Sequence, residues 1–229
     1  MSKKLNAFLP IRSGSQRVPN KNTRMFAGIE GGLSKIKLQQ LLSCEHIDGI
    51  YVSTNDPAIR KISNDLNSDR IRVIDRPQRL ASQSSSTDQL IEYVPEIMPD
   101  GHILWTHVTS PLITAEQYDL MISAYFMGID NYDSLMSVTK IRKFIWDSRG
   151  ALNYNRALEK WPQTQSLPAV WEINSGAFIA SKDTYLNKSD RIGDRPFLYE
   201  LNSDIAIDID WIGDFKIAEV FYKLSQGEL

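Results

Sequence analysis

Short apolar runs alternate with segments of helical periodicity along the first half of this chain. Residues 5–9, 49–53, 71–74 and 102–108 read as strands, and helices are predicted over 33–42 and beginning after Pro57. Apolar strands separated by helices are typical of βαβ units, in which helices cover both faces of a parallel sheet. The pattern therefore predicts an α/β fold with a mostly parallel sheet.

Two further helices are indicated by capping boxes, in which a Ser or Thr N-cap is followed three residues later by Gln. The first box, at 86–89, opens a helix that carries Leu90, Ile91 and Val94. The second, at 114–117, opens a helix whose apolar residues recur at spacings of three and four, so that they share one face. These residues are Tyr118, Met121, Ile122 and Tyr125.

The pattern changes between Ser134 and Glu172, where short apolar pieces are mixed with glycine, asparagine and proline. Such a mixture favours an antiparallel excursion or a projecting arm over another βαβ unit. The core pattern returns with predicted strands over 175–181 and 204–210 and a final amphipathic helix over 214–224. We therefore expect a single domain, residues 1–229, with an arm or insertion at about 134–172.

Composition narrows the class of protein. The 229 residues can bury the core of one large domain, and a formal net charge of −2 gives no reason to expect nucleic acid or an anionic membrane as partner. The single cysteine, Cys44, excludes an internal disulfide framework and is expected to be a small buried residue in a reducing compartment. Pro10 and Arg12 interrupt the first apolar run too early for a signal peptide, and no later run is long enough to span a bilayer. These features predict a cytoplasmic protein.

A basic turn at 12–22 follows the first predicted strand. Backbone N–H groups of its Gly/Ser stretch can converge on an anion, while Arg12, Arg17 and Lys21 supply positive charge. This chemistry predicts a nucleotide phosphate site; a polar surface loop without a ligand is the alternative. The turn is not a Walker A loop, because Pro19 stands where the second glycine would be and Asn22 replaces the magnesium-binding Ser or Thr.

The segment 204–210 offers a second candidate site. Its isoleucines alternate with polar positions, so a strand would place Ile205, Ile207 and Ile209 on one face, with Asp208 and Asp210 side by side on the other. Adjacent carboxylates repel unless a cation lies between them, and Mg²⁺ commonly uses one or two carboxylates together with substrate phosphates. An ordinary edge strand with acidic residues facing water is the alternative. A phosphate-binding loop in the same chain favours the metal site.

Two polar clusters after other strands could also contact a ligand, because ligands of open α/β sheets bind at the carboxyl ends of the strands. In the first, Arg76 precedes Pro77 and Ser82; the arginine could contact a base or a phosphate, or lie on a surface turn. In the second, His107 precedes Thr109 and Ser110, whose hydroxyls could bind a substrate or merely satisfy backbone groups where the strand ends.

Five motifs stand in the order and spacing of the acylneuraminate cytidylyltransferases, also called CMP-sialic acid synthetases, and the chain resembles that family over nearly its whole length. The resemblance implies a three-layer, Rossmann-like α/β fold of the nucleotide-diphospho-sugar transferase type. It also implies a homodimer, in which a small dimerisation arm from each subunit helps to complete the partner's site. The motifs are Arg12-x-Gly14-Ser15-x-Arg17-x-Pro19-x-Lys21-Asn22, Val52-Ser53-Thr54-Asn55-Asp56, Arg76-Pro77-x-x-Leu80-Ala81-Ser82, Thr109-Ser110-Pro111-Leu112 and Ile207-Asp208-Ile209-Asp210.

The reaction implied by the resemblance is transfer of CMP from CTP to the anomeric hydroxyl of a 2-keto-3-deoxy sugar acid, with Mg²⁺ as cofactor and pyrophosphate as the second product. The hydroxyl would attack the α-phosphate directly, a step that needs positioning and charge neutralisation rather than a covalent nucleophile. Its proton could go to Asp208, to Asp210 or to a metal-bound hydroxide.

Site residues are carried over from the same resemblance. The implied catalytic residues are Arg12, Lys21, Asp208 and Asp210, and the last two would hold the metal. The implied nucleotide-binding residues are Arg12, Ser13, Gly14, Ser15, Arg17, Lys21, Asn22, Arg76 and Ser82. The implied substrate-binding residues are His107, Thr109, Ser110, Gln163 and Asn174.

Departures from the family pattern are concentrated among the residues that would bind the acceptor sugar. Gln16 stands where many members have lysine, and His107-Val108 stands where sialic acid enzymes have Gln-Pro. In the arm, Gln163 replaces an arginine that would meet the sugar carboxylate, and 172–176 differs from the usual Arg-Pro-Asn-Gly. The acceptor is therefore open between N-acetylneuraminate, a modified bacterial nonulosonate and another keto-sugar acid such as 3-deoxy-manno-octulosonate.

Two other classes of protein share some of these features. A GT-A glycosyltransferase has a similar nucleotide fold and an acidic metal motif, but that motif usually follows a mid-chain strand. A regulatory module could bind the nucleotide without turnover, although the intact charged residues at 12, 21, 208 and 210 argue against it. The sequence thus favours an enzyme of the nucleotidyltransferase type.

Overall fold

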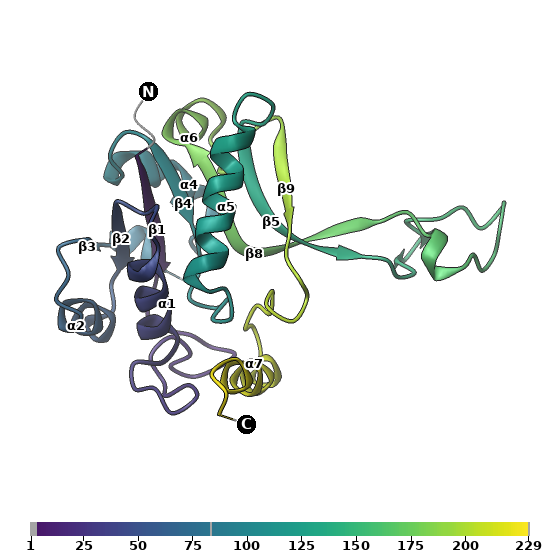
Figure 1. Ribbon diagram of the computed structural model, residues 1–229. Coiled ribbons are helices and arrows are strands. Elements are labelled where there is room, and N and C mark those ends of the chain that lie inside the picture. Colours follow the sequence, from purple (N-terminus) through teal and green to yellow (C-terminus); the bar gives the residue numbers. More distant parts are fainter. Residues whose placement is uncertain (1–3, 83, 229) are drawn as a thin grey trace.

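A computed structural model describes residues 4–82 and 84–228 of the chain. Within those ranges seven strands form one sheet in the order β3-β2-β1-β4-β8-β5-β9, in which β8 runs antiparallel to both of its neighbours and the other pairs are parallel (Figure 1). The predicted α/β fold with a mostly parallel sheet is confirmed. The strands are β1 (Leu5–Ile11), β2 (Gly49–Thr54), β3 (Ile71–Asp75), β4 (His102–Trp105), β5 (Ser134–Ile141), β8 (Val170–Ser181) and β9 (Pro196–Glu200).

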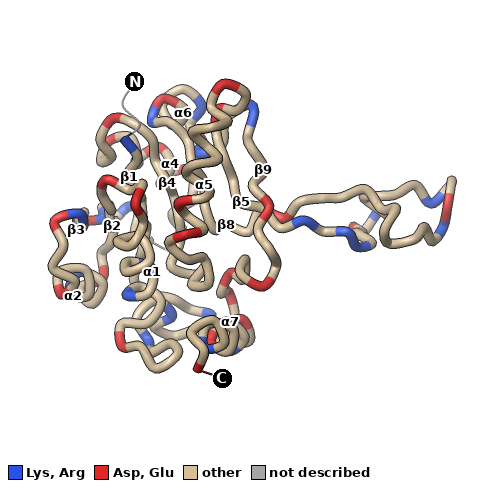
Figure 2. The backbone as a smooth tube through the Cα atoms, in the orientation of Figure 1, with Lys and Arg blue, Asp and Glu red and all other residues tan. Residues whose placement is uncertain are grey.

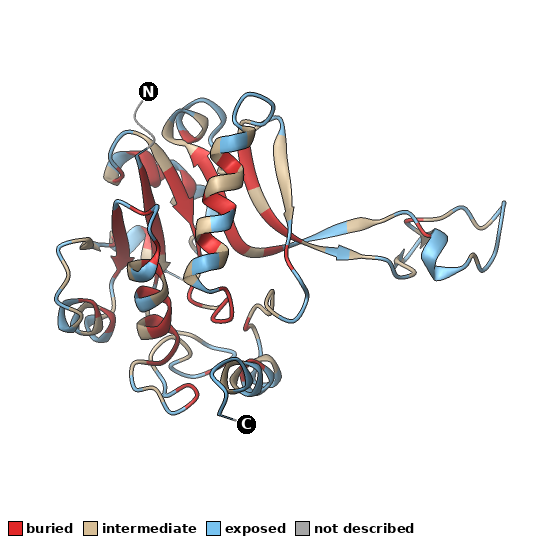
Figure 3. Ribbon diagram, viewed as in Figure 1, coloured by how far each residue is buried: buried red, intermediate tan, exposed pale blue. Residues whose placement is uncertain are grey.

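Helices cover both faces of the sheet, which gives three layers. Alternate residues of β1 divide between two cores: Leu9 packs with the helices of one face, whereas Phe8 packs with those of the other. Burial on both faces explains why β1 is apolar at every position except Asn6, and Figure 3 shows the buried strands at the centre of the molecule. On the first face lie α1 (Gly32–Ser43), α2 (Pro57–Asp65) and α5 (Ala115–Gly128); on the second lie α4 (Thr87–Ile97) and α6 (Lys182–Lys188).

The capping signals place two helices correctly. Ser86 Oγ accepts the N–H of Gln89, and the Gln89 side chain accepts the N–H of Ser86, so the first capping box is complete. Thr114 Oγ1 accepts the N–H of Gln117 at 3.4 Å, and no return bond is found within the described ranges. The face of α5 that was predicted to be apolar is buried.

The last helix, α7 (Ile212–Ser225), closes the structure near the amino-terminal loop (Figure 1). The Phe26 ring meets the rings of Phe215 and Tyr222 edge-on, and the N–H of Ala27 donates to Glu219 at 2.8 Å. These contacts hold α7 against the loop that follows β1. Cys44 is buried, as expected. No helix in the described part of the chain has the length and apolar character needed to cross a membrane.

Two predicted strands are wrong in extent or in kind. β4 ends at Trp105 rather than at Val108: the N–H of Thr106 still donates to the Phe8 carbonyl of β1 at 3.2 Å, and the chain then leaves the sheet and turns at 108–109. The segment 204–210 is not a strand. Its N–H groups bond instead to loops: Ile205 to the Asn202 carbonyl and Ile209 to the Thr109 carbonyl, at 3.2 and 2.9 Å. The alternation of this segment reflects burial of its isoleucines against the core, above all Ile209.

A long antiparallel ribbon projects from the sheet (Figure 1). It is formed by the outer parts of β5 and β8, with β6 (Trp146–Asp147), β7 (Gly150–Ala151) and the 3-10 turn η1 (Thr164–Ser166) beyond them. Residues 134–138, at the start of the expected arm, lie in the sheet itself, where they pair with β9. The projecting part exposes large apolar side chains, namely Trp146, Leu152, Leu158 and Trp161.

Candidate active site

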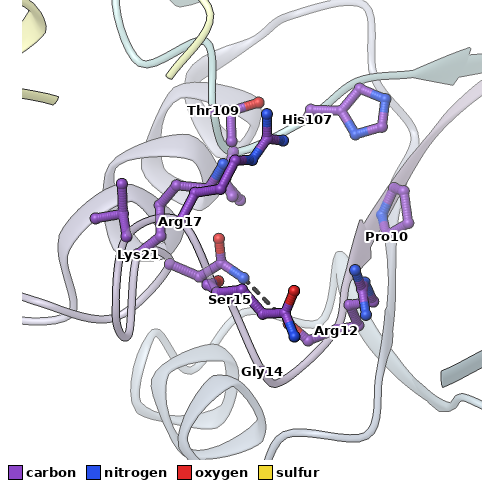
Figure 4. A pocket seen from close by; sticks show the side chains of 12 residues that line it. Pro10, Arg12, Gly14, Ser15, Arg17, Lys21, His107 and Thr109 are labelled. Atoms are coloured by element: carbon purple, nitrogen blue, oxygen red, sulfur yellow. Dashed lines mark hydrogen bonds between the residues drawn. The ribbon is translucent and has the colours of Figure 1, made fainter. Parts of the chain in front are cut away.

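The candidate site is a cleft at the carboxyl ends of the parallel strands. It consists of two adjoining pockets of about 400 and 490 Å³. Figure 4 shows Arg12, Gly14 and Ser15 on one side of the first pocket and His107 and Thr109 on the other. The residues shared by both pockets come from the end of β1, the loop after it and the loop after β4; they are Pro10, Arg12, Arg17, Lys21, His107 and Thr109.

The basic loop begins with a left-handed turn at Gly14, which has a φ of 83° that favours glycine. Ser13 lines neither pocket: its N–H donates to Asn55 Oδ1, and its hydroxyl accepts from Asn55 Nδ2, each at 3.0 Å. Asn22 Nδ2 donates to the Arg12 carbonyl at 3.2 Å, the dashed line in Figure 4, and closes the loop. Gly14, Ser15 and Asn22 line the first pocket. The loop is thus fixed from both ends around an open, basic concavity.

Two cations of this loop hold the acidic segment before α7. Arg17 forms an ion pair with Asp210 at 2.7 Å, and Lys21 Nζ donates to the Ile209 carbonyl at 2.6 Å while lying 3.9 Å from Asp210. Burial lowers the pKa of Lys21, and the carboxylates of Asp210 and Asp208 oppose that shift. Figure 2 shows acidic residues before α7 and basic residues of the loop in the same part of the molecule.

Asp208 and Asp210 line the second pocket together although their segment is not a strand. Burial raises the pKa of Asp208, a side-chain hydrogen bond with Thr109 opposes this, and the charge of Asp210 adds to the rise. Oδ1 of Asp208 is buried and has no hydrogen-bond partner among the described residues. A divalent cation would satisfy that oxygen and separate the two carboxylates, so the residues fit a magnesium ion.

Protein side chains alone would not complete such a metal site. Across residues 4–82 and 84–228, no group of three or more His, Cys, Asp or Glu side chains could hold a metal ion. Mg²⁺ keeps several waters and commonly takes its remaining ligands from substrate phosphates. A pair of carboxylates opposite a basic loop is consistent with that mode of binding.

Arg76 and Ser82 line the second pocket on the side of α3 (Gln78–Ala81). Arg76 is buried; its Nε donates to Ser53 Oγ at 3.3 Å and its Nη2 to the Ser53 carbonyl at 3.0 Å. Burial and then the charge of Arg12 lower the pKa of Arg76 to about 10. Two positively charged arginines that lie close together favour an anionic ligand between them.

The implied substrate residues divide into two groups. His107 and Thr109 line both pockets. His107 Nε2 accepts from Trp105 Nε1 at 3.0 Å, and burial, followed by the charges of Arg191 and Lys21, lowers the pKa of His107 to about 3. The imidazole is therefore neutral, so it can offer the cleft a hydrogen bond but no charge.

The other three implied substrate residues line neither pocket. Ser110 is buried, and its carbonyl accepts from Lys37 Nζ at 2.8 Å. Asn174 is buried in β8, where Oδ1 accepts from the Ser137 hydroxyl at 2.6 Å. Gln163 is exposed on the arm beside η1. Within one subunit, the structure does not bring these three side chains into the cleft.

Sequence reasoning missed three residues that shape the cleft. Ser175, with a φ of 57°, and Arg191 line the second pocket. Lys37 lies fully buried in α1 behind the site, where its Nζ also donates to the Tyr118 hydroxyl at 2.6 Å, and burial lowers its pKa to about 7. Ser175 lies within the segment 172–176 that departs from the family pattern, but no sequence signal separates Lys37 or Arg191 from the many solvent-facing cations of helices and loops.

Comparison with known sequences identifies the family of the chain. The profile of the cytidylyltransferase family matches residues 7–225. The chain is 24% identical over 240 residues to the N-acylneuraminate cytidylyltransferase of Streptococcus agalactiae serotype III, with 96% of this chain and 54% of that protein covered. It is 21% identical over 229 residues to the pseudaminic acid cytidylyltransferase of Campylobacter jejuni serotype O:2, covering 95% of this chain and 96% of that one. The chain thus spans about half the length of the N-acylneuraminate cytidylyltransferases it matches.

Solved structures share the fold. A CMP:2-keto-3-deoxy-manno-octonic acid synthetase complexed with CTP superposes with a TM-score of 0.68 at 16% identity, covering 98% of this chain and 99% of that one. The 4-diphosphocytidyl-2C-methyl-D-erythritol synthase of Anaerococcus prevotii gives a TM-score of 0.66 at 14% identity, covering 96% of each chain. Because the family profile runs from β1 to the end of α7, around the whole of the cleft, the protein belongs to the cytidylyltransferase family.

Proposed function

We propose that this protein transfers CMP from CTP to the anomeric hydroxyl of a nonulosonic, sialic-acid-like sugar acid and releases pyrophosphate. The observation that carries the proposal is the cleft in which Arg12, Arg17 and Lys21 stand opposite Asp208 and Asp210. The two kinds of curated relative named above act, by their names, on N-acylneuraminate and on pseudaminic acid. Both acceptors are nonulosonates, which favours that class here.

The triphosphate of CTP would lie against the loop after β1. Arg12 and Lys21 line both pockets, and the backbone of Gly14 and Ser15 lines the first. Positive groups that are already fixed stabilise the charge that develops on the leaving pyrophosphate without reorganising at the moment of reaction. The nucleoside and the α-phosphate would be contacted by Arg76, Ser82 and Asn22.

Asp208 and Asp210 would hold Mg²⁺, for which the unpartnered Oδ1 of Asp208 provides a ligand. When bound, the ion supplies charge neutralisation to the phosphates. The basic loop would fix the triphosphate. The neutral His107 and the hydroxyl of Thr109, which line the second pocket, would face the acceptor. The anomeric oxygen bonds to the α-phosphorus as the bond from that phosphorus to the bridging oxygen breaks and pyrophosphate leaves, and the hydroxyl proton passes to the carboxylate of Asp208 or Asp210.

A second copy of the chain would cover the arm. Several large apolar side chains of the arm are exposed, Trp146, Leu158 and Trp161 among them, which is costly for a ribbon that stands in water but is expected of an interface. An arm that reaches a partner would also explain why Gln163 lies outside its own cleft. The homodimer is thus part of the proposal.

The experiment is a pyrophosphate-release assay with CTP and Mg²⁺ and three acceptors: N-acetylneuraminate, pseudaminate and 3-deoxy-manno-octulosonate. We expect turnover with one of the first two. Preference for the third acceptor would contradict the nonulosonate assignment, and no release with any sugar acid would contradict the activity itself.

A further inference from the structure

Arg191 is a basic residue of the cleft that none of the roles above uses. It lies after α6, in the loop that leads to β9. Its side chain lines the second pocket but not the first. There it joins the walls formed by Trp105, His107, Ser175 and Asp208.

Aromatic rings fix the plane of the Arg191 guanidinium. Its central carbon lies 3.7 Å from the ring centroid of Phe178 and 4.8 Å from that of Trp105. Stacking on a ring holds a guanidinium through its faces and leaves the N–H groups along its edge free to donate. The side chain is therefore positioned in advance for a ligand that accepts hydrogen bonds.

One nitrogen of this guanidinium lacks a partner in the described structure. Nη1 is buried, and no hydrogen-bond acceptor for it is found among residues 4–82 and 84–228. Burial lowers the pKa of Arg191, although Tyr185 and Asp190 oppose the shift. Arginine nevertheless stays protonated at neutral pH, and a buried charged donor is expected to be satisfied by an anion.

Two anions would enter the cleft in the proposed reaction, the triphosphate and the carboxylate of the sugar acid. Arg12, Arg17 and Lys21 line both pockets and already supply three cations for phosphate, and Arg76 joins them in the second pocket. Arg191 differs from those three in lining the second pocket alone, where residues of β4 and β8 and the neutral His107 also line the wall. A planar carboxylate also matches the parallel N–H groups of one guanidinium edge.

We propose that Arg191 binds the carboxylate of the acceptor sugar acid through its guanidinium, whose Nη1 has no hydrogen-bond partner among the described residues. The inference rests on the proposed function and deepens it, because it makes Arg191 the residue that selects keto-sugar acids over uncharged sugars. The inference also accounts for Gln163, which stands where the family has an arginine in the arm. In this chain Arg191, in the wall of the cleft, would supply the positive charge instead.

The test compares Arg191→Met with Arg195→Met. Methionine at 191 keeps an apolar side chain against Phe178 and Trp105 but removes the charge and the N–H groups. Arg195 is a matched control, since it lies in the same loop, is exposed, and contacts Asp133 through its backbone N–H. Steady-state kinetics with CTP and Mg²⁺ are measured for the sugar acid and for its uncharged carboxamide, and CTP binding is measured by calorimetry.

Loss of a hydrogen bond between charged groups is expected to raise KM for the sugar acid about tenfold to a hundredfold in Arg191→Met, with KM for CTP within about twofold of wild type. The preference for the acid over the carboxamide should fall by the same factor, and Arg195→Met should keep it. If Arg191→Met fails to bind CTP, Arg191→Lys takes its place, with KM for the acid raised and CTP binding retained.

Other results would overturn the assignment in distinguishable ways. An unchanged preference for the acid in Arg191→Met, or an unchanged KM for the acid in Arg191→Lys, refutes the carboxylate contact while the proposed function stands. A rise in KM for CTP alone assigns Arg191 to the triphosphate instead. A wild-type protein that is inactive with every sugar acid removes both proposals.

Discussion

Lys37 carries a titratable amine into the core, and its replacement by methionine should change how the stability of the protein depends on pH. The side chain is fully buried in α1, with Nζ donating to the Ser110 carbonyl at 2.8 Å and to the Tyr118 hydroxyl at 2.6 Å. Burial lowers its pKa to about 7. In the unfolded chain the pKa of a lysine is about 10.4.

The sign of the effect follows from proton uptake. Between pH 7 and about pH 10 the unfolded lysine is protonated while the folded one is largely neutral, so unfolding binds a proton. Rising pH therefore favours the folded state. The slope is at most about 1.4 kcal/mol per pH unit, and the sum over this window is on the order of 4 kcal/mol. Lys37→Met lacks this proton uptake. The unfolding free energy of wild type should therefore rise relative to that of Lys37→Met as the pH increases from 7 to about 10.

Denaturant unfolding at pH 7, 8 and 9 measures that difference for wild type and Lys37→Met. Lys35→Met is the control, since this lysine of the same helix is partly exposed. Parallel pH profiles of wild type and Lys37→Met would refute the reasoning, because they would mean that the amine stays protonated in the folded protein. The result bears on the site as well, since Lys37 fixes the loop that carries Thr109.

Three further predictions concern the cleft and the arm. Asp210→Asn should cut turnover severely and weaken its Mg²⁺ dependence, whereas Asp204→Asn should resemble wild type, because Asp204 is exposed and outside both pockets; the reverse outcome in a Mg²⁺ titration of initial rates would refute the metal assignment. Lys21→Ala should lower turnover by about a hundredfold, the loss expected for one electrostatic contact worth on the order of 3 kcal/mol in the transition state; a normally folded variant with wild-type rates would show that the loop does not hold the phosphates. Replacing Trp146 and Trp161 by serine should shift sedimentation from dimer to monomer, and a wild-type protein that sediments as a monomer would contradict the proposed role of the arm.

The regular part of the fold could be predicted because its signals are local. Apolar runs such as β1 are buried on both faces, and the Ser86 capping box fixes the start of α4. The strand prediction for the segment 204–210 was wrong because alternation of apolar and polar residues indicates which side chains are buried, and not whether the backbone pairs with a neighbouring strand. Ile209 is buried as the alternation predicts, yet its N–H bonds to the Thr109 carbonyl and its own carbonyl to Lys21, so no neighbouring strand is needed.

Site residues that belong to a short sequence motif could be predicted. Residues that reach the cleft only through tertiary packing could not. The loop after β1 and the pair Asp208 and Asp210 face one cleft, as their motifs indicate. Ser110 stands beside Thr109 in the same motif but points into the core, which depends on Lys37. Arg191 reaches the cleft because aromatic rings from β4 and β8 hold it there, a tertiary contact with no signature in the chain.

Product analysis tests the proposed reaction most directly. CTP, ATP and GTP are each incubated with Mg²⁺, a nonulosonic acid and the protein, and the products are identified by mass spectrometry. We predict a CMP-sugar and pyrophosphate in equal amounts from CTP, with far less product from ATP or GTP. Equal turnover of ATP, or release of free CMP without any CMP-sugar, would contradict cytidylyl transfer at this cleft.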